Sequence, residues 1–150
     1  MFKFLLSFCI VFVFAASIVQ AEPSIFHRRY TQNIEYVNRD EPIVYNNLNL
    51  AKEIASTHNR VLVVIFTADW CRYCNVLKAD EDKLFHPKSH VVCYLDFDIE
   101  ENKNLAKRIE VSILPTSIIL QADKKGWTET SRKSGYKYEE YRQWIKEHTL

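Results

Sequence analysis

The stretch from Val61 to Cys74 limits what this chain can fold into more than any other part of the sequence. It reads Val-Leu-Val-Val-Ile-Phe-Thr-Ala-Asp-Trp-Cys-Arg-Tyr-Cys. An apolar, β-branched run bounded by turn signals is typical of a buried strand. We expect Thr67, Ala68 and Asp69 to form the turn, so the strand leads directly into two cysteines separated by two residues.

The residues after this turn predict a helix with Cys71 at its N-terminus. Unpaired backbone N–H groups and the positive end of the helix dipole meet at such a position and favour a thiolate over a thiol. Cys71 is therefore the expected nucleophile. Cys74, one turn further along, is placed to attack a mixed disulfide at Cys71 and release the partner. The positions with helical spacing are Cys74, Leu77, Lys78, Glu81 and Leu84.

In combination these features resemble the thioredoxin-like superfamily, and most closely extracytoplasmic proteins with an Ala-Asp-Trp-Cys-x-Tyr-Cys pattern. The resemblance covers residues 48–150. It implies an α/β fold with a mixed central sheet flanked by helices on both faces, and a thiol-disulfide oxidoreductase activity. The features that carry it are the strand before Trp70, the Cys71 and Cys74 pair, Leu114-Pro115-Thr116, and Gly135-Tyr136 before a final amphipathic helix.

The resemblance also assigns roles to residues around the cysteines. Thioredoxin-like proteins hold a cis proline beside the C-x-x-C, and the backbone of the preceding residue pairs with the substrate chain. We carry this role to Pro115, with Leu114 as the preceding residue. Trp70, Arg72 and Tyr73 are expected to complete the substrate groove. From the residues alone, a proline at the start of an apolar strand is also typical of a sheet edge.

Three positions depart from the thioredoxin pattern. Thioredoxins carry Gly-Pro between the cysteines, whereas this chain has Arg72-Tyr73. A cation beside Cys71 stabilises its thiolate, and a more stable reduced form makes the disulfide more oxidising. Ile65 stands where thioredoxins keep a buried aspartate that helps move the proton of the resolving cysteine, which argues against fast reductase cycling. Tyr73 resembles the residue before the second cysteine of bacterial disulfide isomerases, so the direction of electron flow stays open.

Helical and strand patterns alternate in the first half of the chain. A helix over Leu48–Thr57, capped by Asn46 or Asn47, precedes the strand that begins at Val61. Later the chain predicts a strand over Val91–Asp96 and a helix over Asn102–Ile109. This alternation predicts parallel strands joined by crossover helices.

The second half predicts a hairpin and a closing helix, which add antiparallel strands to the sheet. The segments are an apolar run over Thr116–Leu120, a turn over Asp123–Gly126, a strand over Trp127–Ser131, and a helix with Tyr141, Trp144, Ile145 and His148 on one face.

The N-terminus predicts a secretory signal over residues 1–21, with the positive charge of Lys3, an apolar stretch over Phe4–Val19 and a small-residue cleavage site at Ala21. An uncleaved anchor is the alternative, but the stretch is short for a bilayer that needs roughly 20 apolar residues. The mature chain would begin at Glu22. Residues 22–47 are an N-terminal arm that stays unassigned, in which Ile34–Val37 and Ile43–Tyr45 form either short edge strands or an extended arm.

Charge narrows the range of partners. The chain has 20 basic and 19 acidic side chains, and loss of Lys3 with the signal leaves 20 − 1 = 19 of each. No basic run or aromatic-interleaved basic stretch occurs in the sequence, so nucleic acid and anionic membrane surfaces are not expected partners. With only two glycines, a phosphate-binding loop is excluded as well.

The mature chain would keep three cysteines, which cannot all pair within one chain. The loop closed by Cys71 and Cys74 is so short that a bridge there adds little structural stability, which favours a redox role. Cys93 lies in an apolar run and is expected in the core. No metal site and no cofactor are expected, because His58, His86 and His90 are not at ligand spacing from the C-x-x-C.

Two functions are consistent with the sequence. The first is an extracytoplasmic thiol-disulfide oxidoreductase, periplasmic or secreted, that exchanges disulfides with protein substrates through Cys71 and Cys74. We expect it to be a monomer that a membrane redox partner resets. The second is a non-catalytic thioredoxin-fold binding or chaperone module with an inert disulfide. The reduction potential of the cysteine pair separates the two.

Overall fold

The computed structural model describes residues 43–124 and 126–149. The expected signal over residues 1–21 and the possible strand Ile34–Val37 lie outside this part of the chain. Within the described ranges, every helix is too short or too polar to span a bilayer.

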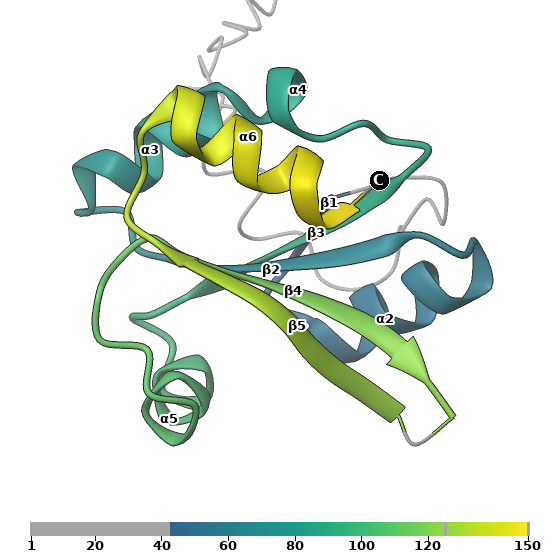
Figure 1. The fold of residues 1–150 in the computed structure, drawn as a ribbon. Coiled ribbons are helices and arrows are strands. Elements are labelled where there is room, and N and C mark those ends of the chain that lie inside the picture. Colours follow the sequence, from purple (N-terminus) through teal and green to yellow (C-terminus); the bar gives the residue numbers. More distant parts are fainter. Residues whose placement is uncertain (1–42, 125, 150) are drawn as a thin grey trace, which may run out of the picture. The chain divides into compact units, whose positions relative to one another are not determined.

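A mixed sheet of five strands forms the centre of the fold, as the sequence predicts (Figure 1). In the order β1-β3-β2-β4-β5, the first three strands are parallel, whereas β4 is antiparallel to β2 and to β5. The edge strand begins at Ile43, so the sheet starts before Leu48, the expected first residue of the domain. The strands are β1 (Ile43–Tyr45), β2 (Val61–Thr67), β3 (His90–Asp96), β4 (Thr116–Asp123) and β5 (Gly126–Ser134).

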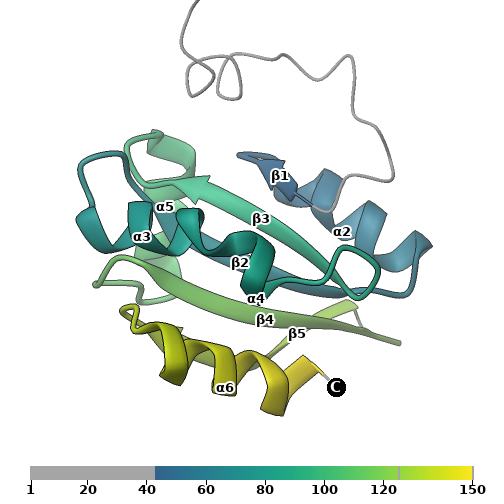
Figure 2. The same cartoon turned by 90° about the horizontal axis from the view of Figure 1, so that it is seen from above.

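Helices cover both faces of the sheet, which confirms the predicted architecture (Figures 1 and 2). Two of them, α2 and α5, lie on one face, and the other three lie on the opposite face. The helices are α2 (Leu48–Thr57), α3 (Arg72–Ala79), α4 (Glu81–Leu84), α5 (Glu100–Arg108) and α6 (Tyr138–Thr149).

The strand β2 supplies side chains to both layers of the core. Leu62, Val64 and Phe66 belong to an apolar cluster with α2 and α5. Val63 and Ile65 belong to a second cluster with α3, α4 and α6. Because side chains alternate along a strand and both faces are covered, β2 needs an apolar residue at nearly every position. The uninterrupted apolar run before the cysteines follows from this.

Two asparagines at the start of α2 have different roles. Asn47 is the cap, because its side chain accepts the Leu50 N–H at 3.0 Å. Asn46 adopts a left-handed backbone with φ 54° and lies at the end of β1. Its side-chain oxygen accepts the Asp96 N–H at 2.7 Å and the Asn102 amide at 2.9 Å. Asn46 therefore ties the end of β1 to the end of β3 and to α5.

The helical pattern from Cys74 to Leu84 forms two helices rather than one. The break falls at Asp80, whose backbone N–H closes α3 on the carbonyls of Val76 and Leu77. The Asp80 carboxylate accepts hydrogen bonds from Lys83 Nζ at 2.7 Å and from Tyr136 Oη at 2.8 Å. These polar partners hold Asp80 at the helix junction, and α4 turns away from the line of α3 (Figure 2).

Candidate active site

Cys71 and Cys74 are joined by a disulfide at the carboxyl end of β2, with the sulfurs 2.12 Å apart. Cys71 is the N-cap of α3, and its sulfur accepts the Cys74 N–H at 3.2 Å. Cys71 is 7% exposed and less accessible than its position before the helix suggests, whereas Cys74 is 1% exposed. Of the two cysteines, Cys71 is therefore the more accessible to a partner arriving from solvent.

The turn before the disulfide is held by short local bonds. Thr67 is still part of β2, because it pairs with Asp96, so the turn begins after it and not at Thr67. Ala68 is fully buried against both cysteines, and its carbonyl accepts the Cys71 N–H at 3.1 Å. The Asn75 amide donates to the Asp69 carbonyl at 3.0 Å, which fixes the turn to the first turn of α3.

The loop before β4 lies beside the disulfide, and its Leu114–Pro115 peptide bond is cis. Leu114 packs against the buried cluster that contains both cysteines. The Gly135 N–H donates to the Pro115 carbonyl at 2.8 Å, and Gly135 itself has φ +77°, a backbone conformation that favours glycine. This bond joins the loop to the end of β5.

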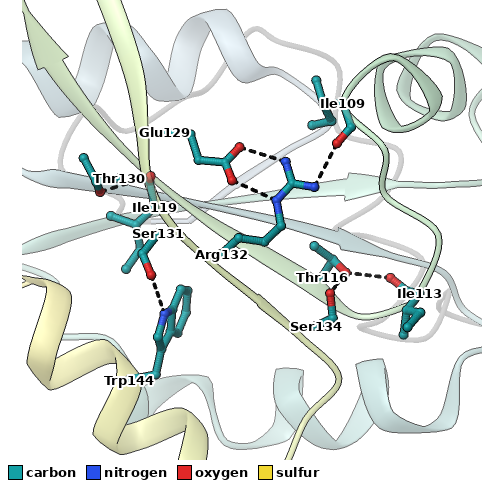
Figure 3. Close-up of polar contacts among 10 residues, drawn as sticks. All are labelled: Ile109, Ile113, Thr116, Ile119, Glu129, Thr130, Ser131, Arg132, Ser134 and Trp144. Atoms are coloured by element: carbon teal, nitrogen blue, oxygen red, sulfur yellow. Dashed lines mark hydrogen bonds and ion pairs between the residues drawn. The ribbon is translucent and has the colours of Figure 1, made fainter.

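Side chains from β4 and β5 fix the same loop (Figure 3). The Thr116 hydroxyl donates to the Ile113 carbonyl at 2.7 Å and lies 2.9 Å from Ser134 Oγ. Arg132 donates to the Ile109 carbonyl at 2.8 Å, at the C-terminus of α5, where a cation also meets the negative end of the helix dipole. The loop that follows α5 is thus anchored at both ends.

Glu129 holds Arg132 in place for this contact. Two nitrogens of the guanidinium donate to the two carboxylate oxygens of Glu129, each at 2.8 Å (Figure 3). The paired bonds raise the pKa of Arg132 further above its ordinary value. Such a two-bond geometry orients the guanidinium as well as attracting it.

Two pockets flank Leu114, which lines both. The tryptophan-side pocket has a volume of about 400 Å³ and contains Cys71 in its wall; its lining residues are Trp70, Cys71, Arg72, Phe97, Val111, Ser112 and Leu114. The tyrosine-side pocket has a volume of about 350 Å³; its lining residues are Tyr73, Ile113, Leu114, Lys133, Ser134, Gly135, Tyr136, Lys137 and Glu140. A chain bound over Leu114 would therefore have a hollow on each side.

The structure gathers four of the five expected groove residues around these pockets. Trp70 is 67% exposed, and its indole N–H donates to both oxygens of the Asp98 carboxylate, at 3.0 and 3.1 Å. Arg72 lines the tryptophan-side pocket, and Tyr73 lines the tyrosine-side pocket. Pro115 is buried and lines neither pocket. It contributes to the site through the position of the Leu114 backbone.

Several lining residues were not expected from the sequence. Ile113 is 55% exposed, and an apolar residue directly before the Leu114-Pro115 pair is a signal that could have indicated it. Phe97 and Val111 look like ordinary core residues in the sequence. Lys133 and Lys137 belong to no motif, and only the fold brings them into one pocket with Tyr73 and Leu114.

Cys93 lies away from the disulfide, as expected for a core residue. It is fully buried in β3 and packs in the cluster on the α2 and α5 face. Burial raises the pKa of its thiol to about 12, so it stays protonated near neutral pH. It is therefore neither a nucleophile nor a resolving thiol.

A mostly buried cation lies one helical turn after Cys74. The Lys78 side chain is 13% exposed, and its Nζ lies 3.9 Å from Asp69 Oδ1 and 5.6 Å from the ring centroid of Tyr94. Burial lowers the pKa of Lys78, against the opposing influence of Asp69. Ile65, which pairs with Tyr94 across the sheet, is fully buried and carries no charge. The mostly buried ionisable side chain on this face is thus a lysine, on which the carboxylates of Asp69, Asp96 and Glu81 act.

No group of three or more His, Cys, Asp or Glu side chains that could hold a metal ion occurs within residues 43–124 and 126–149.

Comparison with known proteins places the chain in a family. The family model described as Thioredoxin matches residues 41–147. Among curated proteins, thioredoxin 2 of Plasmodium falciparum (isolate 3D7) is 26% identical over 96 residues, which are 64% of this chain and 57% of that protein. Thioredoxin-T of Drosophila melanogaster is 27% identical over 78 residues, 52% of this chain and 50% of that protein. The chain thus spans little more than half the length of these curated relatives.

Solved structures show the same fold. A thioredoxin from Thermus thermophilus superimposes with a TM-score of 0.57 at 24% identity, over 71% of this chain and 86% of that chain. A malaria parasite thioredoxin-2, described as a component of the parasite's protein secretion machinery, superimposes with a TM-score of 0.50 at 30% identity, over 59% of this chain and 84% of that chain. With the family model matching well over half of its residues, this chain belongs to the thioredoxin family.

Proposed function

We propose that the protein is a thiol-disulfide oxidoreductase that acts on protein substrates outside the cytosol. One observation carries the proposal. The Cys71 sulfur lies at a helix N-terminus in the wall of an open pocket, and its disulfide partner Cys74 is buried behind it. This arrangement suits an exchange in which one sulfur meets the substrate and the other resolves the intermediate.

The exchange proceeds in two balanced steps. In the reductive direction, the Cys71 thiolate attacks one sulfur of a substrate disulfide, forms a mixed disulfide and releases the other substrate sulfur as a thiolate. The Cys74 thiolate then attacks the Cys71 sulfur, forms the Cys71–Cys74 disulfide and releases the second substrate thiolate. Two electrons pass from the protein to the substrate. The same steps in reverse oxidise a substrate dithiol.

The surroundings of Cys71 favour its thiolate. The Cys74 N–H already donates to the Cys71 sulfur at 3.2 Å, and a hydrogen bond to an anionic sulfur is stronger than one to a neutral sulfur. The exposed Arg72 side chain and the helix dipole add positive potential at the same point. Attack on Cys71 rather than on Cys74 follows from this and from the difference in exposure.

The substrate chain is proposed to cross Leu114, with its backbone pairing to that of Leu114. Peptide groups in this loop are held by Thr116, Gly135 and Arg132, so little further ordering is needed when a chain binds. The Trp70 indole donates a hydrogen bond to the Asp98 carboxylate, and Trp70 forms one wall of the tryptophan-side pocket. Protein segments in an extended conformation are the substrates that such a shallow, two-sided surface fits.

Location outside the cytosol is proposed from the N-terminal sequence. The apolar stretch Phe4–Val19 after Lys3, followed by Ala21, supports export and cleavage before Glu22. A disulfide persists in such a compartment, and a membrane redox partner would reset it. The mass of the intact secreted protein tests the cleavage site, and a full-length chain found in membranes would indicate an anchor instead.

A binding module with an inert disulfide is the second candidate. The low exposure of Cys71 and the apolar residue at Ile65 favour it, because both would slow exchange. Trapping of mixed disulfides and the reduction potential of the cysteine pair separate this module from the oxidoreductase.

Trapping of mixed disulfides tests the proposed roles. Cys74→Ala removes the resolving thiol, so substrate proteins should accumulate as mixed disulfides with Cys71 on non-reducing gels. Cys71→Ala should accumulate few, and Cys93→Ala should behave like the parent because that thiol is buried. Equal trapping by the Cys71 and Cys74 variants would contradict the assigned roles.

A further inference from the structure

The tyrosine-side pocket has more positive than negative charge in its wall. Two lysines there share one carboxylate: Lys137 Nζ lies 2.9 Å from Glu140 Oε1, and Lys133 Nζ lies 3.9 Å from Glu140 Oε2. No other charged side chain lines this pocket within the described ranges. The wall therefore carries two ammonium groups against one carboxylate.

The neighbouring acidic groups are engaged elsewhere and do not balance this excess. The Asp80 carboxylate accepts hydrogen bonds from Lys83 and from the phenol of Tyr136. Glu139 lies 3.8 Å from Arg142 on the exposed side of α6. These neighbouring carboxylates therefore do not neutralise the excess of one positive charge in the pocket wall.

Lys133 is the cation with the weaker contact. Its distance of 3.9 Å from Glu140 is at the limit for an ion pair, and only 24% of its side chain is exposed. Lys137 makes the closer contact with the same carboxylate and is 78% exposed. A second carboxylate, supplied by a ligand, would find two ammonium groups that share one partner.

The rest of the pocket offers apolar contacts. Tyr73 is 61% exposed and Ile113 is 55% exposed, and both lie in the lining beside the half-buried Leu114. An acidic side chain has methylene groups that can lie on this apolar surface while its carboxylate reaches the lysines. Glutamate fits this combination better than aspartate, because its stem is longer.

The pocket begins next to the disulfide. Tyr73 follows Cys71 by two residues, and Leu114 lines both this pocket and the one that contains Cys71. An extended chain advances about 3.3 Å per residue, so a side chain one to about three residues from the reacting cysteine can reach the pocket.

Resting on the proposed function, we propose that the tyrosine-side pocket selects substrate segments that carry an acidic side chain, glutamate above all, within about three residues of the reacting cysteine. The preference is electrostatic, and the charged side chains that cause it are partly exposed to solvent. The effect should therefore be modest, about 3- to 10-fold in rate between acidic and basic segments at low salt. It should shrink at about 1 M salt, where the screening length falls to roughly 3 Å.

Three peptides test the proposal. Each carries the same disulfide and differs only in having Glu, Gln or Lys two residues from the reacting cysteine. The protein, beginning at Glu22 and reduced beforehand, is mixed with each peptide, and the second-order rate constant of peptide reduction is measured at low and high salt. The expected order is Glu, then Gln, then Lys, with the rates converging at high salt.

Variants show whether the lysines cause the order. The readout is the ratio of the Glu-peptide rate to the Gln-peptide rate for each variant. The double variant Lys133→Gln and Lys137→Gln should bring this ratio to one or below, because the Glu140 carboxylate remains in the wall, and Glu140→Gln should raise it. Lys88→Gln, in an exposed loop outside both pockets, is the matched control and should leave the ratio as in the parent.

The outcomes distinguish this inference from the proposed function. Reduction of all three peptides at equal rates, or a preference that survives in the double lysine variant, would overturn the inference and leave the oxidoreductase in place. Failure to reduce even the Gln peptide, together with failure of the oxidised protein to oxidise the dithiol form of that peptide, would instead contradict the proposed function.

Discussion

The three cysteines within the described residues have distinct environments, although all are buried to some degree. Cys71 accepts a backbone N–H at a helix N-terminus, Cys74 lies in the first turn of α3 and is buried, and Cys93 lies between apolar side chains of β3 and its neighbours. Reactivity of a thiol depends on how easily it becomes a thiolate and on access to its sulfur. The same residue type is therefore the proposed nucleophile at one position and a core residue at another.

Cys93 should stay unmodified in the folded protein. With a pKa of about 12, only about one thiol in ten thousand is ionised at pH 8. In a chain that begins at Glu22, reduction followed by brief iodoacetamide treatment should add one label, on Cys71, without denaturant and three with it. Mass spectrometry counts the labels, and a third label in the folded protein would show that Cys93 is accessible.

Sequence patterns predict the proposed redox pair better than the residues that line the two pockets. Cys71 and Cys74 follow from a motif with a local physical meaning, a strand leading into a helix N-terminus. Lys133 and Lys137 are ordinary lysines in the sequence, and their significance depends on where β5 ends in space. Ile113 is an intermediate case, because the sequence shows its position directly before Leu114 but does not show that its side chain is exposed.

The loop between α5 and β4 is held by β5, an element that follows it in the chain. Arg132 donates to the Ile109 carbonyl at the end of α5, and Thr116 donates to the Ile113 carbonyl (Figure 3). The Gly135 N–H donates to the Pro115 carbonyl. A loop fixed at several points keeps the Leu114 backbone in one conformation. We infer that β5 contributes to the site by positioning this loop.

Arg132→Ala should lower the free energy of unfolding of the oxidised protein by about 1 kcal/mol, because it removes a charged hydrogen bond to Ile109 and the partner of Glu129. Urea unfolding measures the change. Arg142→Ala is the control, since its contact with Glu139 is 3.8 Å long and exposed, and exposed pairs contribute little. An equal effect of the two substitutions would argue against the anchoring role of Arg132.

The helix α6 is attached to the sheet partly through His90. Its Nε2 lies 3.0 Å from Thr149 Oγ1, and its Nδ1 lies 3.0 Å from the His86 backbone nitrogen and 3.2 Å from the His86 carbonyl oxygen. The Thr149 hydroxyl donates in turn to the Ile145 carbonyl at 2.6 Å. Burial lowers the pKa of His90 below its ordinary value of 6.5.

Acid should therefore weaken the fold through His90. Because its pKa is lower in the folded state, the unfolded chain binds the proton more readily, and stability falls as the pH drops through about 6.5 toward the folded value. The stability advantage of the parent over His90→Gln should narrow between about pH 8 and about pH 5.5 in urea titrations. His58→Gln, at an exposed position, should follow the parent at both pH values, and a gap that stays constant would rule out His90 as the cause.

The sequence predicts the existence and the type of the helices and strands well, but it predicts some of their boundaries poorly. The α2 bounds match the prediction, because Asn46 and Asn47 are both residues typical of a helix cap and the apolar positions share one face. The break at Asp80 is not visible in the pattern, since Cys74 to Leu84 keeps helical spacing across it. The contact between Asp80 and Tyr136 that helps to hold the break joins residues 56 apart in the chain.

In the molecule as a whole, the site forms where three distant parts of the described chain meet. The cysteines come from the end of β2, the cis peptide bond from the start of β4, and the lysines from the end of β5 and the residues that follow. The alternation of helices and strands predicts a sheet with helices on both faces. It hence predicts that these three parts lie at the same end of the strands. It does not predict the pockets, which depend on how side chains from separate elements fit together.

The reduction potential of the Cys71–Cys74 pair is the most direct test of the central claim that this disulfide is catalytic. Equilibration of the protein in glutathione or dithiothreitol buffers, with the oxidised fraction read by thiol labelling, gives the value. A potential within roughly −120 to −270 mV, the range of known thiol-disulfide catalysts, is the result we predict. A value below about −300 mV, typical of structural bridges, would contradict the claim and favour a binding module.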